Sequence, residues 1–103
     1  MERIKSDWID ARYSEIENEV AVKLRDNEQF KALRQQRSKL AEENPFITQL
    51  LEGKGSISIT EDEHAAFVKY IMLQIAEENM ERKELYCFGH ADCIAYFRQI
   101  GIL

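Results

Sequence analysis

Proline and glycine are scarce in this chain of 103 residues, which contains one proline and four glycines. Both residues interrupt helices, and chains rich in β-structure use them at their many turns. Their scarcity, together with 32% charged residues, favours a helical chain over a β-rich or a disordered one. The length suits a single domain spanning residues 1–103, with one core and no room for a second module.

An excess of positive charge is absent as well, since the net charge is -5 and the isoelectric point is about 5.1. An acidic chain lacks the general attraction to phosphate on which most nucleic-acid-binding proteins depend. No apolar run reaches the roughly 18 residues that span a bilayer, and the first ten residues (MERIKSDWID) lack the apolar core of a signal peptide. We therefore expect a cytoplasmic protein without membrane contact.

Only two cysteines are present, Cys87 and Cys93, six positions apart on an expected helix. The helical rise alone separates them by about 9 Å, so they cannot form a disulfide with each other. Their spacing around His90 contains ligand types suited to zinc. A helix brings only Cys87 and His90 to one side, however, and a free cysteine is commonly a small buried apolar residue. We expect no bound metal and no cofactor, with a Cys87/His90 metal site as an alternative.

Apolar residues recur every three or four positions in the first quarter of the chain, which predicts a helix from about residue 3 or 6 to residue 25. These residues are Ile9, Tyr13, Ile16, Val20 and Leu24. Residues 26–29 contain signals for the end of this helix and for the start of a new one. A second helix follows with a stripe of Phe30, Leu33, Arg37 and Leu40. Pro45 ends that helix and begins a short one over residues 46–52.

The remainder of the chain predicts one long helix. Residues 56–59 alternate, but they are too few for a sheet, and Thr60 with Glu63 forms a capping box. If the helix continues to the end it is about 60 Å long, so it either bends near Gly89 or projects into another subunit. Its apolar residues fall in one arc of about 120°, which predicts a core face. They are Phe67, Val68, Ile71, Ile75, Leu85, Tyr86, Gly89, Cys93, Tyr96, Phe97 and Ile100.

Residues 85–103 are apolar almost all the way round the helix, with Asp92 and Arg98 as their only formal charges. A helix of this kind needs partners on several sides. We therefore predict a homodimer, with the small Ala91 and Ala95 permitting a close approach of two helices. The expected interaction residues are Leu85, Tyr86, Gly89, Ala91, Ala95, Tyr96 and Ile100.

The core face is interrupted once, at Glu78, Asn79 and Arg82. Glu78 and Arg82 have the favourable order for an ion pair along a helix, and Arg37 in the stripe of the second helix completes a predicted polar layer. Polar layers in helical assemblies most often fix the register of pairing. A small-ligand activity that uses Glu78 and Arg82 is the alternative.

A basic run without acidic residues lies between Glu28 and Glu42. It is formed by Lys31, Arg34, Arg37 and Lys39. Nucleic-acid binding through these side chains is a third interpretation, against which the net charge argues. The alternative is attraction to the acidic stretch at residues 77–84.

The C-terminal pattern of Tyr86, Gly89, Asp92 and Cys93, followed by an apolar run into Gly-Ile-Leu, resembles the ending of short uncharacterised helical proteins of low-GC Gram-positive bacteria and their mobile elements or phages. The resemblance covers about twenty residues and implies a cytoplasmic bacterial or phage setting. It implies no chemistry.

Together these patterns predict an all-α helical bundle of three main helices plus one short helix, with a long C-terminal helix. We expect no catalytic residues and no enzymatic activity. The predicted function is protein-protein interaction, with itself and with an unknown protein, in a regulatory or adaptor role. The role would be inhibitory if a mobile element encodes the chain.

Overall fold

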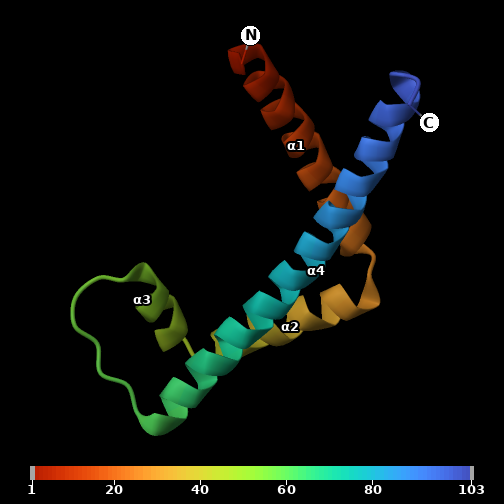
Figure 1. Ribbon diagram of the computed structural model, residues 1–103. Coiled ribbons are helices and arrows are strands. Elements are labelled where there is room, and N and C mark those ends of the chain that lie inside the picture. The colour runs from red at the N-terminus through yellow and green to blue at the C-terminus, as the bar shows by residue number, and fades with distance from the viewer. Residues whose placement is uncertain (1, 103) are drawn as a thin grey trace. The chain divides into compact units, whose positions relative to one another are not determined.

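The computed structural model describes the backbone of residues 2–102 and the side chains of residues 8–102. Four helices and no strand are present among these residues, which confirms the predicted all-α fold with a long C-terminal helix (Figure 1). The helices are α1 (Glu2–Arg25), α2 (Glu28–Glu43), α3 (Phe46–Glu52) and α4 (Glu61–Gln99). None of the described helices is both long enough and apolar enough to cross a membrane.

The helix ends follow from local sequence signals. Helix α3 begins directly after Pro45, whose φ of -58° is already helical. It ends at Gly53, which adopts a φ of 68° and donates its backbone N–H to the carbonyl of Leu50. At the start of α4, Thr60 Oγ1 accepts the Glu63 N–H at 3.1 Å and the Glu63 carboxylate accepts the Thr60 N–H at 2.9 Å. The predicted capping box is therefore confirmed.

Helix α4 is continuous from Glu61 to Gln99 and passes through Gly89 without interruption. It contributes to both of the compact units into which the chain divides. Unit 1 comprises Met1–Asn27 and Asn79–Leu103, and unit 2 comprises Glu28–Glu78. The prediction that the chain is a single domain stays a prediction.

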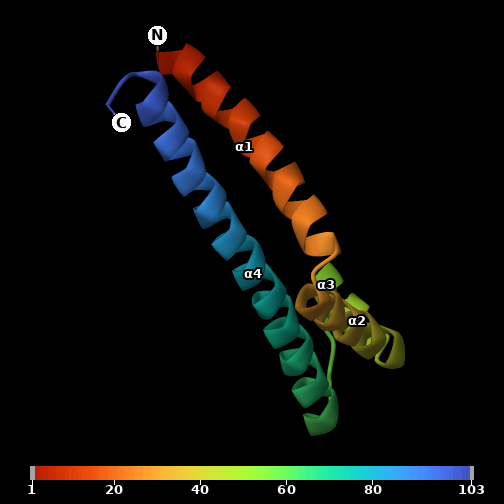
Figure 2. The same ribbon diagram turned by 90° about the vertical axis from the view of Figure 1, so that its right-hand side faces the viewer.

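Unit 1 pairs α1 with the C-terminal part of α4, and the two run in opposite directions (Figure 2). Its buried apolar side chains are Ile16, Val20 and Leu24, spaced four residues apart on one side of α1. The same side of α1 continues toward the N-terminus with Ile9 and Tyr13, but these side chains are exposed. Figure 1 shows why, because α1 and α4 diverge toward the chain ends.

Unit 2 packs α2, α3 and the N-terminal part of α4 around three buried apolar side chains, one from each helix. Phe30 comes from α2, Ile47 from α3 and Tyr70 from α4. Ile47 is fully buried, so it anchors the short helix against its neighbours. The fourth buried residue of this unit is charged: Glu77 on α4 is only 4% exposed.

The predicted core face of α4 is only partly covered, since Phe67, Ile71, Leu85 and Phe97 are half-buried. Its members Val68, Ile75, Tyr86, Tyr96 and Ile100 are all exposed, and the buried residues of the helix are Tyr70 and Glu77. The physical reason is that α1 and α2 contact a different side of α4, which carries paired acidic residues together with Tyr70 and Phe88. The distribution of apolar residues around α4 alone does not show which side of the helix α1 and α2 cover.

Candidate interaction surface on helix α4

Three acidic residues define the side of α4 that its own chain covers. Glu77 pairs with Arg37 of α2 in unit 2. In unit 1, Glu84 pairs with Lys23 and Asp92 pairs with Arg12, both from α1. The three acids are seven and eight residues apart, so they lie on one side of the helix. We call this side of α4 the acidic face.

The Arg37 cluster is the polar centre of unit 2. The guanidinium of Arg37 donates two hydrogen bonds to the Glu77 carboxylate, through Nε and through Nη2 at 3.2 Å. A third donor, Nη1, reaches the Tyr70 hydroxyl at 3.1 Å, and the guanidinium lies 5.6 Å from the centre of the Tyr70 ring. The hydrogen bond to Glu77 raises the pKa of Arg37. The buried Glu77 charge is thus held by a two-pronged partner.

In unit 1, Arg12 and Asp92 form a second two-pronged pair, with both N–O distances at 2.7 Å. Arg12 also donates to Glu15 at 3.1 Å. The hydrogen bond from Arg12 lowers the pKa of the Asp92 carboxyl group, and the same bond raises the pKa of Arg12. This pair fixes which side of α4 faces α1.

Lys23 forms the remaining contact of the acidic face. Its Nζ lies 2.7 Å from the Glu84 carboxylate and 6.0 Å from the centre of the Phe88 ring. The hydrogen bond to Glu84 raises the pKa of Lys23. Ion pairs and one aromatic ring on α4 therefore accompany the buried aliphatic stripe of Ile16, Val20 and Leu24 on α1.

The other side of α4 carries a heptad pattern that its own chain leaves exposed. Residues at successive steps of four and three face outward, which is the spacing of a coiled-coil stripe. We call this set the α4 seam. In unit 2 it comprises Ala65, Val68, Met72 and Ile75, and in unit 1 it comprises Asn79, Arg82, Tyr86, Gly89, Cys93, Tyr96 and Ile100. Its large apolar side chains are 41–69% exposed.

The predicted interaction residues divide between these two sides. Tyr86, Gly89, Tyr96 and Ile100 belong to the exposed seam. The remaining three are Leu85, which is half-buried, and Ala91 and Ala95, which are exposed and lie on the side of α4 that carries Phe88 and Asp92. That side faces α1, so the small residues that favoured a close helix contact are not on the seam.

The predicted polar layer of Arg37, Glu78 and Arg82 stays a prediction, and the structure adds Glu77 as a partner of Arg37. Arg37 donates two hydrogen bonds to Glu77, the residue before Glu78. Arg82 is exposed and donates to the side-chain oxygen of Asn79 at 3.0 Å. Glu77 was missed because it lies beside Glu78 in sequence but about 100° away round the helix. Its seven-residue spacing to Glu84 was the available signal.

The alternative metal site was predicted at Cys87 and His90, with Cys93 nearby on the same helix. Cys87 and Cys93 are exposed free thiols, and the His90 ring contacts Tyr86 with ring centres 4.3 Å apart. In the described part of the chain, no three His, Cys, Asp or Glu side chains gather closely enough to hold a metal ion.

The basic run of α2 is divided among local contacts. Lys31 lies 3.7 Å from Glu28 and Lys39 lies 3.9 Å from Glu43, while Arg34 lies over the Phe30 ring. Arg37 points to α4. A shallow hollow of about 280 Å³ in unit 2 is lined by Gln36, Lys39, Leu40, Glu43 and Lys69.

The chain matches a family of unknown function (DUF6664) over residues 3–103, and it belongs to that family. No curated protein and no solved structure shows a significant match to it. The family therefore adds no chemistry to the surfaces described above.

Proposed function

We propose that this protein is non-enzymatic and acts by binding another protein through the α4 seam. The observation that carries the proposal is the orientation of α4, whose acidic face is paired with α1 and α2 while its apolar seam is exposed. A surface helix of an isolated domain buries its apolar residues, whereas α4 leaves the large apolar side chains of its seam 41–69% exposed. Large apolar side chains that are exposed along one side of a helix mark interaction sites.

Aromatic residues strengthen the proposal. Tyr86 and Tyr96 lie on the seam in unit 1, and Trp8 and Tyr13 on α1 of the same unit are also exposed. Aromatic side chains are enriched in the energetically important parts of protein interfaces. The setting that we propose is the bacterial cytoplasm, which the C-terminal resemblance supports.

A capture experiment with matched variants tests the proposal. The tagged chain, its Tyr86→Glu variant and its Arg98→Gln variant are each exposed to extract from the native host, and retained proteins are quantified, untagged copies of this chain included. Both substitutions change the net charge by the same amount, but Arg98 lies off the seam. We expect proteins that the unmodified chain and Arg98→Gln retain and that Tyr86→Glu loses. Equal retention by all three would contradict the proposal.

A further inference from the structure

The α4 seam has polar residues at only two of its positions, and they are consecutive. Asn79 and Arg82 stand between apolar residues on both sides. From this pattern we infer that the partner of the seam is a second copy of the same chain, which lies antiparallel so that Asn79 of one copy faces Arg82 of the other. The inference rests on the proposed function and names its partner.

An antiparallel pair matches the seam positions from Ala65 to Tyr96 by size, while Ile100 faces Glu61 at the first turn of α4. With Asn79 facing Arg82 of the second copy, Ile75 faces Tyr86, Val68 faces Cys93 and Met72 faces Gly89. Ala65 faces Tyr96 in the same way. Large side chains therefore meet small ones in most layers, as close packing requires. Apart from the contact of Asn79 with Arg82, these contacts join unit 2 of one copy to unit 1 of the other, and symmetry repeats each of them.

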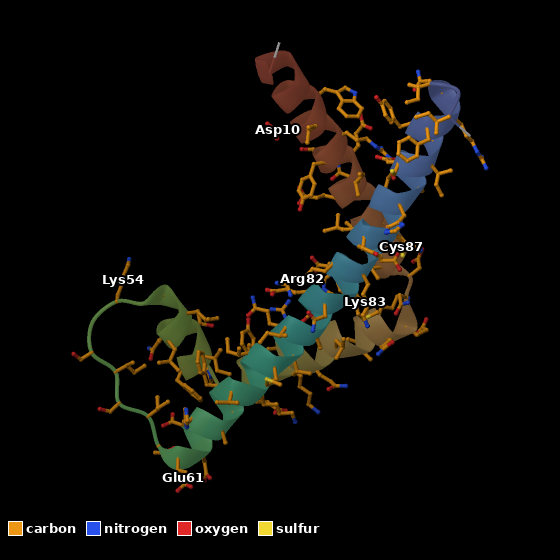
Figure 3. The ribbon with its side chains drawn as sticks, viewed as in Figure 1. Asp10, Lys54, Glu61, Arg82, Lys83 and Cys87 are labelled. Carbon is orange, nitrogen blue, oxygen red and sulfur yellow. The ribbon has the colours of Figure 1, made fainter. Side chains whose placement is uncertain are left out.

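Charge distinguishes this pairing from a parallel one. In the antiparallel pair, Arg82 faces Asn79 of the second copy, and Glu78 of that copy is the next residue beside the seam. In a parallel pair, Arg82 would face its own counterpart with Lys83 of the second copy beside it, even though Glu78 and Lys83 could pair at the rim. Figure 3 shows Arg82 and Lys83 leaving α4 on different sides. Like charges in an interface are unfavourable and select against that arrangement.

Gly89 supports the same arrangement. Glycine inside a helix is less favourable than alanine, and no other described part of the chain lies within 4 Å of the position that a Cβ would take there. No contact within the chain therefore requires a glycine. The long Met72 side chain of the second copy, which faces Gly89 in the antiparallel pair, requires the space.

The area of the seam is in the range that a stable dimer needs. Six large apolar side chains of the seam are 41–69% exposed. At roughly 100 Å² each they offer on the order of 600 Å² per copy, close to the roughly 800 Å² per partner of a standard interface. The six residues are Val68, Met72, Ile75, Tyr86, Tyr96 and Ile100.

Thiol crosslinking tests the pairing directly, because Cys93 is an exposed native probe on the seam. In a chain that carries Cys87→Ser, a second cysteine is introduced by Val68→Cys, and the full-length protein is treated with a short bismaleimide. We expect a covalent dimer in which mass spectrometry joins position 68 of one copy to Cys93 of the other. The control, Asp62→Cys in the same background, places its thiol on the same helix but off the seam and should give little covalent dimer.

The crosslinking results distinguish an antiparallel pair from a parallel one. A covalent dimer of the Cys87→Ser chain alone, joined through Cys93 of both copies, would show parallel pairing and overturn the inference. Failure of position 68 to link to Cys93 would also overturn it, provided that circular dichroism shows an intact helix. A second pair, Ala65→Cys with Tyr96→Cys and Cys93→Ser, covers a folding failure. If crosslinking fails while Tyr86→Glu still abolishes capture of a different protein, the proposed function stands without this inference.

Discussion

At the scale of single residues, the acids of α4 decide which side of the helix is covered. Glu77, Glu84 and Asp92 each find one basic partner on another helix. An ion pair at an exposed site contributes little to stability, but a charge that is buried needs its partner. The three contacts therefore differ in their energetic weight, and Glu77, the most buried, should matter most.

The pKa of Asp92 is the first prediction at this scale. The hydrogen bond from Arg12 holds it below its ordinary value of 3.8. A carboxyl group whose pKa falls on folding contributes stability that is present above the ordinary pKa and is lost as the pH falls through the folded value. Arg12→Gln should return the Asp92 pKa toward its ordinary value in a carboxyl-carbon NMR titration. An unchanged titration of Asp92 would show that the pair does not form in solution.

The second prediction concerns the Arg37 cluster. Arg37→Leu leaves the buried Glu77 carboxylate without its two-pronged partner and should lower the free energy of unfolding by roughly 3 to 5 kcal/mol. Adding Glu77→Leu to the same chain should recover most of that loss, because no stranded charge remains. Urea unfolding of the single and double variants measures both effects. If Arg37→Leu alone is neutral, the carboxylate is reached by water and the cluster is not buried.

At the scale of elements, the boundaries of the helices were predictable and the covered side of α4 was not. Pro45 and the Thr60 capping box act within a few residues, so a single sequence contains their whole signal. The partner of an acid on α4 lies 40 to 80 residues away. Apart from the seven-residue spacing of Glu77 to Glu84, neighbouring acids such as Glu77 and Glu78 are therefore equivalent until a second helix selects one of them.

The same limit applies to the candidate interface. The seam residues Tyr86, Gly89, Tyr96 and Ile100 were predicted because the segment is apolar all round, which is a local property. Ala91 and Ala95 were assigned to the same interface by size alone. Helix periodicity places them beside Phe88 and Asp92, but whether that side of α4 faces α1 depends on where α1 packs.

The capping box provides a prediction for α4 as an element. Thr60→Ala removes the side-chain oxygen that accepts the Glu63 N–H and should lower the free energy of unfolding by about 1 kcal/mol. Ser58→Ala, in the exposed linker just before the helix, is the matched control and should change stability little. Chemical denaturation of both variants compares them. Equal stabilities would mean that the first turn of α4 contributes nothing to the unfolding transition.

At the scale of the whole molecule, each unit has a small apolar core and a larger exposed apolar surface. Unit 1 buries three apolar side chains and unit 2 buries three, among the side chains that the structure describes. Small cores give marginal stability, and association is one of the ways in which short chains compensate. The stability of this protein should therefore increase with its concentration, as mass action requires for a dimer whose folding and association are coupled.

The mass of the unmodified protein in solution tests the central claim, that the α4 seam pairs two copies. Sedimentation equilibrium at micromolar concentration should give about twice the 12.1 kDa of one chain, and Ile75→Glu, which places a charge on the seam, should return the mass to that of one chain. Ala91→Glu, on the side of α4 that faces α1, should leave the dimer largely intact. A mass of one chain for the unmodified protein across the whole concentration range would contradict the account.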